Sequence, residues 1–463
     1  MSLLLNNELK TLSVENISFL ARQRAGDRVW LDDAGSLMWL QFAAAIERVT
    51  HECREAGLQP GDVVVTSGES TLDALVWLFG VAAAGGVVAP LRRERQRELQ
   101  GWKNFLKIGW REVEGRIERV DAGKCSAVAT ALLRELRQRD HPGLILATGG
   151  TGGNPKIVLH DLAALLAAIP IKPPATRRTL PLMRFDHIGG LDMAWRALGG
   201  GHTLVAPPAQ ITPATVAAAI DRHRVEVLPA TPSFLNLLLL AGVKITHDLG
   251  SLRLVPYGAE SMPAGLLARL RAAFPAVEFK QRFGTSETGA LPVREKGSGL
   301  TLRNDCPGYE WKVIDGELWV RSPTRALGYL SGNSQVFDSP GWFRTGDLAE
   351  EMSNGATRVI GRRENVINVG GEKVLPGEVE EVLLTHPLVS DCRVSFEPNA
   401  MLGQVVSAEI VWSGGEFDAL VVKRILHDFA AHLLSRHKLP AIVRLVSSVG
   451  TTRNFKKFRQ SSV

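Results

Sequence analysis

Short runs of β-branched and aliphatic residues alternate with Ala- and Leu-rich stretches over the first 280 residues of the chain. The Ala- and Leu-rich stretches, such as residues 213–223 and 263–274, are typical of helices. Alternating buried strands and helices favour an α/β architecture with largely parallel sheets. The apolar runs are "GDVVVTSG" (61–68), "GVVAPL" (86–91), "GLILAT" (143–148), "HTLVAPP" (202–208), "VEVLPATP" (225–232) and "SLRLVPYG" (251–258).

The pattern changes twice further along the chain. From Leu302 to about Ile360, short strand-like runs and turns predict a small β-barrel or twisted sheet. After Arg363, amphipathic helical stretches and strand-like runs predict a compact α+β unit, at 376–387, 405–412, 418–434 and 441–448. We therefore expect a large N-terminal domain over 1–362, with stacked, mostly parallel α/β sheets and the barrel-like part, and a small C-terminal domain over 363–463.

One apolar stretch raises the question of a membrane span. Residues 74–90, "ALVWLFGVAAAGGVVAP", carry no charge and approach the lower length limit of a transmembrane helix. The break at Gly85 and Gly86, followed by "VVAPL", instead predicts a buried helix that turns into a strand.

Composition narrows the class of protein. Hydrophobic residues make up 45% and charged residues 22% of the chain, which is ordinary for a globular protein. The net charge of +6 is compatible with acidic partners such as a nucleotide, coenzyme A or an acidic carrier protein, whereas 48 acidic residues argue against nucleic acid. The four cysteines are far apart, so they indicate neither a disulfide framework nor a metal site. With no secretory pattern in "MSLLLNNELK", we expect a cytoplasmic protein.

The stretch "LATGGTGGNPKIVLH", residues 146–160, carries the strongest chemical signal. Glycines allow backbone N–H groups to approach a ligand closely, and the threonine hydroxyls and Lys156 add donors and a charge. These features indicate a polyphosphate site, with a flexible turn as the alternative. The P-loop pattern fails because Gly153 is followed by Asn-Pro-Lys-Ile. The Rossmann pattern fails because the loop joins two predicted strands, and a helix starts only at Asp161, a predicted N-cap.

Four further stretches carry weaker signals. Glu287 in "QRFGTSETG" could hold Mg²⁺ beside phosphates or be a solvated loop acid. Asp347 in "GWFRTGDL" could accept hydrogen bonds from a ribose diol or end a β-turn. The segment "GRRENVINVGGEKV" (361–374) could be a functional junction or a basic linker, and the lysines of "TTRNFKKFRQ" (451–460) could be functional or simply solvated.

The order of these motifs resembles that of the adenylate-forming acyl-CoA synthetase superfamily, also called AMP-binding enzymes. The matching series is TGGTGGNPK, YGAESMP, FGTSE, GWFRTGDL, GRREN with INVGGEKV, and a terminal T-x-x-x-K. It extends from about Gly61 to Arg459. The resemblance implies that the small C-terminal domain is mobile and carries a catalytic lysine.

The resemblance also assigns residues of this chain to the nucleotide and its metal. The phosphate loop, which orients the β- and γ-phosphates of ATP, comprises Thr148, Gly150, Thr151, Gly153 and Lys156. The segment lining the adenine and acyl pockets comprises Gly258, Ala259 and Glu260, and Phe283 stacks on adenine. Ser286 and Glu287 match a Thr-Glu pair in which Glu287 binds Mg²⁺, and Asp347 and Arg362 match the ribose-binding positions.

The remaining assignments concern the catalytic and mobile parts. Lys456 matches the catalytic lysine, His187 lies where a histidine often guards the carboxylate channel, and Glu364 stands at the hinge. Gly370, Gly371 and Lys373 fall in the segment expected to meet the thiol substrate. Several positions depart from the family pattern: Gly149 and Gly152 replace hydroxyl residues, Phe455 replaces the glycine before Lys456, and Lys457 is a second lysine beside it.

The resemblance implies a two-step reaction. A carboxylate attacks ATP to give acyl-AMP and pyrophosphate, and a thiol then displaces AMP to form a thioester. The segment "LPLMRFDHIGGLDMAW" (181–196) looks somewhat like that of o-succinylbenzoate:CoA ligases, which favours an aryl or bulky acid, with a fatty acid as the alternative. The thiol is coenzyme A or the phosphopantetheine arm of an acidic acyl carrier protein. A binding-only homologue is the alternative from another class.

Overall fold

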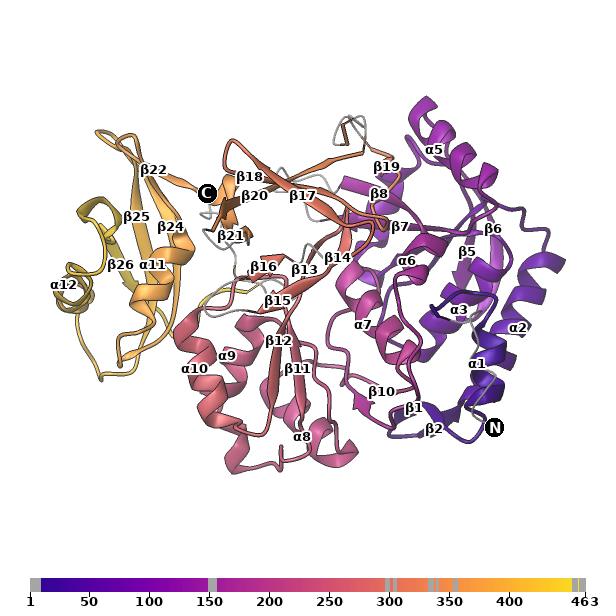
Figure 1. Cartoon of the computed structure of the whole chain (residues 1–463), viewed down its shortest axis with the longest axis horizontal. Coiled ribbons are helices and arrows are strands. Elements are labelled where there is room, and N and C mark those ends of the chain that lie inside the picture. Colours follow the sequence, from indigo (N-terminus) through magenta and orange to yellow (C-terminus); the bar gives the residue numbers. More distant parts are fainter. Residues whose placement is uncertain are drawn as a thin grey trace.

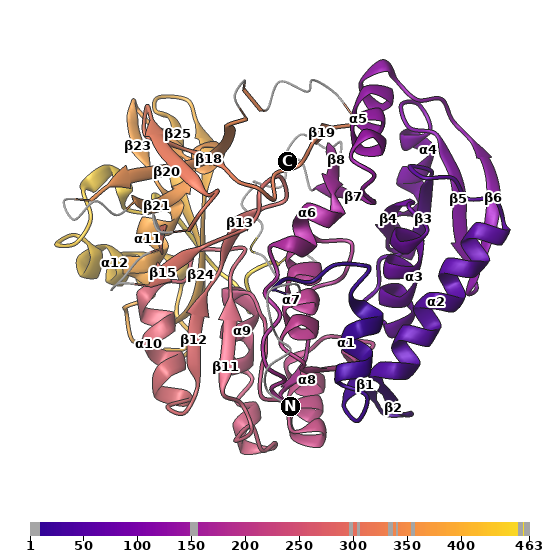
Figure 2. The same ribbon diagram turned by 45° about the vertical axis from the view of Figure 1, so that its right-hand side comes forward.

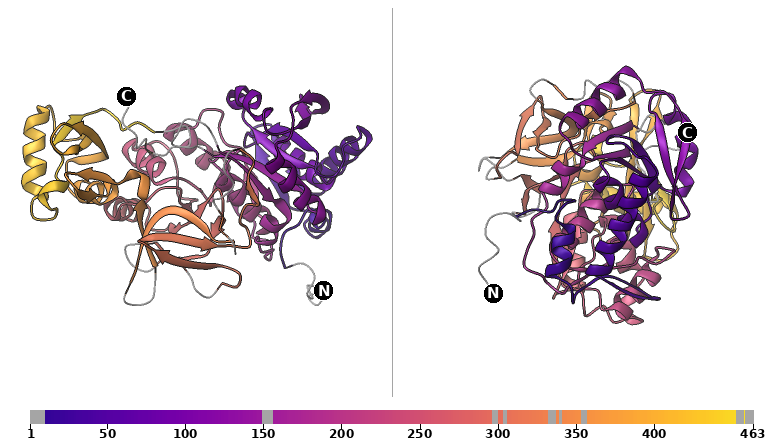
Figure 3. Two further views of the ribbon diagram at one scale, coloured as in Figure 1. Left: turned by 90° about the horizontal axis from the view of Figure 1, so that it is seen from above. Right: turned by 90° about the vertical axis from the view of Figure 1, so that its right-hand side faces the viewer.

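The computed structural model describes residues 10–148, 156–295, 300–302, 306–331, 337–338, 341–352, 357–451 and 457 of the 463-residue chain. Its parts follow one another along the sequence from the right to the left of Figure 1. Seen from above, the C-terminal part (yellow) and the first helices (indigo) lie at opposite ends of the molecule (Figure 3).

A seven-stranded sheet forms the centre of the N-terminal part. In spatial order its strands are β19 (Gly328–Tyr329), β8 (Lys156–Asp161), β7 (Gly143–Thr148), β4 (Val87–Leu91), β3 (Val63–Ser67), β5 (Ile108–Val113) and β6 (Arg116–Ala122). The four strands β7, β4, β3 and β5 are parallel. Strands β6, β8 and β19 join them in antiparallel pairing, so the sheet is parallel at its centre and antiparallel at both edges.

Side chains on alternate positions of these strands pack into two different cores. Val64 and Val88 face one core and Val63 and Val87 face the other, because successive strand residues point to opposite faces of a sheet. The first core includes residues of α1 (Ile17–Gln23), α2 (Trp39–Glu55), α3 (Leu72–Ala83), α6 (Leu162–Ala167) and α7 (Ile188–Gly199). The second includes residues of α4 (Leu99–Trp102) and α5 (Ala127–Gln138).

A second sheet extends from near α1 to the far side of α7 (Figure 2). Its strands are β2 (Gly35–Met38), β1 (Arg28–Asp32), β10 (Thr203–Val205), β9 (Arg178–Thr179), β11 (Leu254–Tyr257) and β12 (Glu278–Gln281). Between β9 and β11 the chain makes only isolated parallel bridges, at Val227 and Ala230, where a strand was expected over 225–232. Its neighbouring helices are α8 (Pro213–His223), α9 (Pro232–Leu240) and α10 (Ala264–Ala273), whose buried side chains share one core.

An antiparallel layer follows, where the sequence predicts a barrel or twisted sheet. Its strands, in spatial order, are β15 (Val293–Glu295), β16 (Leu300–Leu302), β21 (Thr357–Arg362), β20 (Phe343–Glu351), β18 (Glu317–Arg321) and β17 (Glu310–Ile314). A separate hairpin, β13 (Phe283–Thr285) and β14 (Gly289–Leu291), connects it to the second sheet. Short 3-10 turns occur at η1 (Arg93–Glu98), η2 (Val243–Ile245), η3 (Arg363–Asn365) and η4 (Arg436–Lys438).

The C-terminal part has its own sheet and core. The strands are β23 (Glu372–Val374), β22 (Ile367–Val369), β25 (Gly403–Trp412), β24 (Val389–Asn399) and β26 (Ile442–Leu445), and the helices are α11 (Pro376–Leu383) and α12 (Ala419–Ala430). The stretch 376–387, predicted to be an amphipathic helix, contains α11, on which Val379 and Leu383 are fully buried in the core of this part. Asp418 caps α12, because its carboxylate accepts a hydrogen bond from the backbone N–H of Leu420.

The predicted α/β class is confirmed. The uncharged stretch 74–90 forms most of α3, a turn, and most of β4, as expected from its Gly85-Gly86 break. Gly85 has a φ of +83°, in the left-handed region that favours glycine. Within the described residues, no helix has the length and apolar character needed to cross a membrane.

Candidate active site

The strands that frame the glycine-rich loop pair as the sequence predicts. β7 and β8 are antiparallel, with Thr148 opposite Lys156, so the loop joins strand to strand. Asp161 then caps α6 by accepting the N–H of Ala164 at 3.1 Å. Gly150, Thr151 and Gly153 lie outside the described residues. Lys156 of the predicted phosphate loop is exposed at the first position of β8.

Lys156 lies beside a tyrosine, which in turn is hydrogen-bonded to a glutamate. Its Nζ is 5.4 Å from the centre of the Tyr329 ring, close enough for a cation–π contact. Tyr329 comes from β19, which pairs with β8, and its hydroxyl donates a 2.6 Å hydrogen bond to Oε1 of Glu287. Burial and the charge of Glu287 raise the pKa of Tyr329, so its hydroxyl stays protonated as a donor.

Glu287 is held in the turn between β13 and β14. Its backbone N–H donates to Thr285 Oγ1 at 3.2 Å, and its carbonyl accepts from the N–H of Ala326 at 2.7 Å. These bonds fix the direction of the side chain. Oε1 of Glu287 accepts the hydrogen bond from the Tyr329 hydroxyl. This bond does not use the lone pairs on Oε2.

Asp347 and Arg362 face each other on neighbouring strands. They are register partners on β20 and β21, and Arg362 Nε lies 2.8 Å from Asp347 Oδ1. Arg362 is itself held by a bond from Nη1 to the carbonyl of Thr345 at 2.9 Å. Asp347 is 4% exposed, and its Oδ2 has no hydrogen-bond partner within the described part of the chain. An orphaned buried carboxylate oxygen costs on the order of 1–3 kcal/mol until a donor reaches it.

The pKa of Asp347 is consistent with a buried carboxylate that lacks a hydrogen-bond donor on one oxygen among the described residues. Burial raises its pKa to about 6, although Arg362 opposes that rise and the charges of Glu287 and Glu364 add to it. Arg362 likewise opposes the rise in the pKa of Tyr329. The two pairs, Tyr329 with Glu287 and Asp347 with Arg362, therefore belong to one electrostatic cluster, which we call the junction cluster together with Lys156.

The segment Gly258–Glu260 follows β11 and approaches the chain beyond β12. A Cβ on Gly258 would lie 2.6 Å from the carbonyl oxygen of Arg282, so only glycine fits there. Ala259 adopts a φ of +69°, a strained conformation for a residue with a side chain. Glu260 accepts from the backbone N–H and the hydroxyl of Ser233, at 3.2 and 2.7 Å, at the start of α9. These two bonds fix the segment to α9, which packs in the core shared by α8, α9 and α10.

Phe283, Ser286 and His187, the other predicted residues of the large domain, each have different surroundings. Phe283 is half-buried against the small core of the antiparallel layer, and Ser286 lies in the turn beside Glu287. His187 is the N-cap of α7, and its Nδ1 accepts the N–H of Gly189 at 3.0 Å. An imidazole that accepts at Nδ1 is neutral, with its proton on Nε2.

The predicted residues of the small domain divide into three groups. Gly370 and Gly371, with φ of +59° and +98°, form the two-residue turn between β22 and β23, and Lys373 is exposed on β23. The turn lies near Leu402 of the same domain. Glu364 is exposed in η3, where its neighbour Arg363 lies 3.0 Å from Glu317. Lys456 lies outside the described residues.

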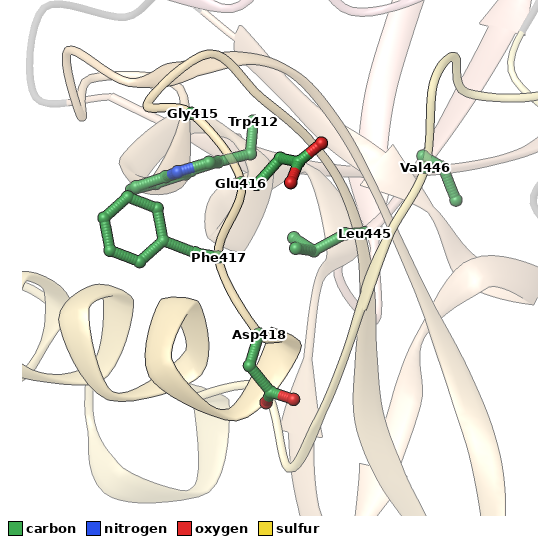
Figure 4. A pocket seen from close by; sticks show the side chains of 7 residues that line it. All are labelled: Trp412, Gly415, Glu416, Phe417, Asp418, Leu445 and Val446. Atoms are coloured by element: carbon green, nitrogen blue, oxygen red, sulfur yellow. The ribbon is translucent and has the colours of Figure 1, made fainter.

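One hollow of the described structure, in the C-terminal part, is unrelated to these motifs. Seven residues between β25, α12 and β26 line it: Trp412, Gly415, Glu416, Phe417, Asp418, Leu445 and Val446 (Figure 4). Trp412 stacks on His386 with ring centres 5.3 Å apart. None of the predicted site residues lines this hollow, so we place the candidate active site at the junction cluster.

Two contributors to the junction cluster, Tyr329 and Thr345, are not among the residues predicted from the sequence. Tyr329 lies in "ALGYLSG" and joins the cluster only because β19 pairs with β8. Thr345 lies in the Asp347 motif, and its hydroxyl accepts the N–H of Asp347 at 3.0 Å while its carbonyl holds Arg362. The position of Thr345 within the motif could have suggested a supporting role, whereas Tyr329 requires the sheet topology.

The fold is that of adenylate-forming enzymes. A crystal structure of an anthranilate CoA ligase in complex with anthranoyl-AMP superimposes with a TM-score of 0.79, at 19% identity, over 98% of this chain and 96% of that one. Two sequence-family models also match the chain. The model described as AMP-binding enzyme matches residues 110–330, and the model described as AMP-binding enzyme C-terminal domain matches residues 378–456. The chain belongs to the adenylate-forming superfamily of AMP-binding enzymes, as the motif order predicted.

Two relatives align along nearly the whole chain. A probable CoA ligase of Humulus lupulus is 27% identical over 97% of this chain and 92% of its own length. A fatty acid–acyl-carrier-protein ligase of Streptomyces coeruleorubidus is also 27% identical, over 98% of this chain and 96% of its own length. The two relatives differ in the thiol that their names give, and both are ligases.

Proposed function

We propose that this protein activates a carboxylic acid with ATP, forming acyl-AMP and pyrophosphate, and then transfers the acyl group to a thiol, with coenzyme A as the first candidate. The observation that carries the proposal is the Oδ2 of Asp347 at the junction cluster, which has no hydrogen-bond partner among the residues that the structure describes. A ribose diol supplies hydroxyl donors that satisfy this oxygen, while Arg362 keeps the other oxygen in place.

The rest of the cluster suits the triphosphate. Lys156 is a cation at the base of the glycine-rich loop, and Tyr329, which its Nζ approaches, is hydrogen-bonded to the carboxylate of Glu287. Within the described residues, no three His, Cys, Asp or Glu side chains gather as metal ligands. A magnesium ion bound by one carboxylate plus substrate phosphates needs no such group, so Glu287 fits as its protein ligand. The ion would supply charge neutralisation of the phosphates, while Lys456 would act at the carboxylate and the α-phosphate.

The proposed binding of the carboxylic acid rests on the segments after β11 and before α7. Gly258 and Ala259 would form part of the wall for the adenine and the acyl group, and Phe283 would stack on adenine. His187, neutral and fixed by the N–H of Gly189, would stand at the carboxylate channel. The proposed substrate class is an aryl or fatty acid.

A second candidate acceptor has separate support. The Streptomyces relative is named for an acyl carrier protein, and the net charge of +6 suits an acidic protein partner. In that case a phosphopantetheine arm replaces coenzyme A, and the acid-activation step is the same. The turn Gly370–Gly371 and Lys373 would meet the thiol substrate in either case, after the small domain pivots near Glu364.

A two-stage assay tests the proposal. Pyrophosphate release is measured with ATP, Mg²⁺ and a panel of aryl and fatty acids, first without thiol and then with coenzyme A or a holo acyl carrier protein. We expect release that depends on the acid, and a thioester with one of the two thiols, detected by mass spectrometry. ATP binding without pyrophosphate release across the panel would instead support a binding-only homologue.

A further inference from the structure

The C-terminal tail returns from the small domain to the large one at Lys457. Lys457 pairs with Thr451 in an antiparallel bridge. The backbone N–H of Lys457 donates a 2.6 Å hydrogen bond to Oε1 of Glu260. Glu260 is the same side chain whose Oε2 holds Ser233 at the start of α9. The tail is therefore hydrogen-bonded directly to the Gly258–Glu260 segment.

The side chain of Lys457 points the other way, into the small domain. Its Nζ lies 2.8 Å from Asp391 Oδ1 and 2.5 Å from the carbonyl oxygen of Cys392, both at the start of β24. The side chains of Lys457 and Asp391 are only 9% and 4% exposed. Burial alone would lower the pKa of Lys457, but the charges of Glu380 and Asp391 outweigh it and raise the pKa. Lys457 therefore stays charged and committed to this pair.

Neighbouring contacts extend this connection between the two domains. The carbonyl of Ser390, next to Asp391, accepts from Asn236 on α9 and from Arg269 on α10, at 3.4 Å in each case. Figure 1 shows α9 and α10 facing α11 and β24 across the same boundary. Among these residues, Lys457 alone comes from the tail, and it contacts the large domain with its backbone and the small domain with its side chain.

We propose that Lys457 is a positioning residue, which anchors the tail between Asp391 and Glu260 and thereby holds the adjacent Lys456 at the site of acid activation. Lys456 is joined to Lys457 by a single peptide bond, so an anchor at Lys457 acts on the residue directly before it. The proposal rests on the function proposed above. It also separates the roles of the two tail lysines, because an ammonium group buried against Asp391 is not free to act on a phosphate.

The first test compares the two half-reactions in full-length variants. We expect Lys457→Met to reduce kcat for acid-dependent pyrophosphate release on the order of a hundredfold, with little change in KM for ATP, since small displacements of a catalytic group have effects of that size. Thioester formation from supplied acyl-AMP should fall far less. Lys457→Arg should recover part of the lost rate. The control is Lys438→Met, which removes a lysine–glutamate pair inside the small domain and should leave both steps unchanged.

A loss of folding is a separate outcome, because Lys457→Met leaves Asp391 and Glu380 buried without their cation. The double variant Lys457→Met with Asp391→Asn removes one of these charges, so it should recover the melting temperature without recovering the rate. Equal losses in both half-reactions, or a rate that recovers with the melting temperature, would overturn the positioning role and leave a structural one.

A third measurement does not depend on catalysis. The tail contains Arg453 and Arg459, so trypsin can cut on both sides of Lys457. Under native conditions without ligands, the double variant should be cut at these arginines at least several-fold faster than wild type, with an equal melting temperature. Unchanged cleavage would refute the anchor. If cleavage accelerates but wild type itself releases no pyrophosphate with any acid, the anchor stands and the proposed function fails.

Discussion

Two buried carboxylates in the antiparallel layer sit almost side by side and have opposite environments. Glu317 on β18 is paired with Leu348 on β20, the residue after Asp347, and the two acids are 2% and 4% exposed. Glu317 receives Arg344 Nη2 at 2.8 Å, Arg363 Nε at 3.0 Å and the N–H of Gly346 at 3.0 Å. Asp347 has Arg362 on one oxygen and no described partner on the other.

The pKa values of the two acids move in opposite directions for this reason. Burial alone would raise the pKa of Glu317, but the hydrogen bonds and charges of Arg344 and Arg363 lower it. Burial raises the pKa of Asp347 to about 6, because Arg362 alone does not compensate. Glu317 is paired with two arginine side chains and suits a structural role, whereas the open oxygen and raised pKa of Asp347 make it the candidate for ligand binding. Glu317 also ties the layer to Arg363, beside the predicted hinge.

Replacing the open acid should have the largest effect on activity. Asp347→Asn keeps the size of the side chain, but it places an NH₂ donor where a ribose hydroxyl has to donate. We expect kcat/KM for ATP in the pyrophosphate assay to fall on the order of a hundredfold or more, the equivalent of about 3 kcal/mol. Glu350→Gln is the control, since Glu350 is an exposed acid on the same strand. Activity close to wild type in Asp347→Asn would remove the main support for the ribose site.

Asp347 and Glu317 should also affect the pH dependence of stability in opposite ways. As the pH rises from 4 to 6, unfolded Asp347 loses its proton near its ordinary pKa of 3.8, while the folded form keeps it until about 6. Stability therefore falls with rising pH in this window, by about 3 kcal/mol for a shift of about two units. Asp347→Asn removes that fall, so its melting temperature relative to wild type should rise between pH 4 and pH 6.

Glu317 should show the reverse dependence on pH. Its lowered pKa means that its stabilisation is present above the ordinary value of 4.5 and is lost as the pH falls through the folded value. The deficit of Glu317→Gln relative to wild type should thus be largest above about pH 4.5 and shrink in stronger acid. Melting curves of the three proteins from pH 3.5 to 7.5 measure both trends. Parallel curves for both variants would show that the two environments do not differ.

Sequence patterns predict the helices and strands whose formation depends on residues close together in the sequence. Long apolar runs and caps give β3, β4, β7, α3 and α6, because burial and capping act within a few residues. The run 225–232 fails as a strand, since its pairing depends on neighbours far along the chain. Motif order brings Asp347 and Arg362 together correctly. Glu317, Tyr329 and Lys457 escape prediction because their partners lie 27 to 197 residues away in sequence.

Tyr329→Phe should have the smallest effect and shows whether a supporting bond matters at the junction cluster. The change removes only the hydroxyl that donates to Glu287 at 2.6 Å and keeps the ring beside Lys156. A single hydrogen bond of about 1 kcal/mol corresponds to roughly a fivefold fall in kcat for pyrophosphate release. Tyr309→Phe, a second tyrosine with a shielded hydroxyl in the antiparallel layer, should leave the rate unchanged. A loss as deep as that of Asp347→Asn would move Tyr329 from a supporting to an essential role, and no loss at all would mean that Glu287 is oriented by its backbone alone.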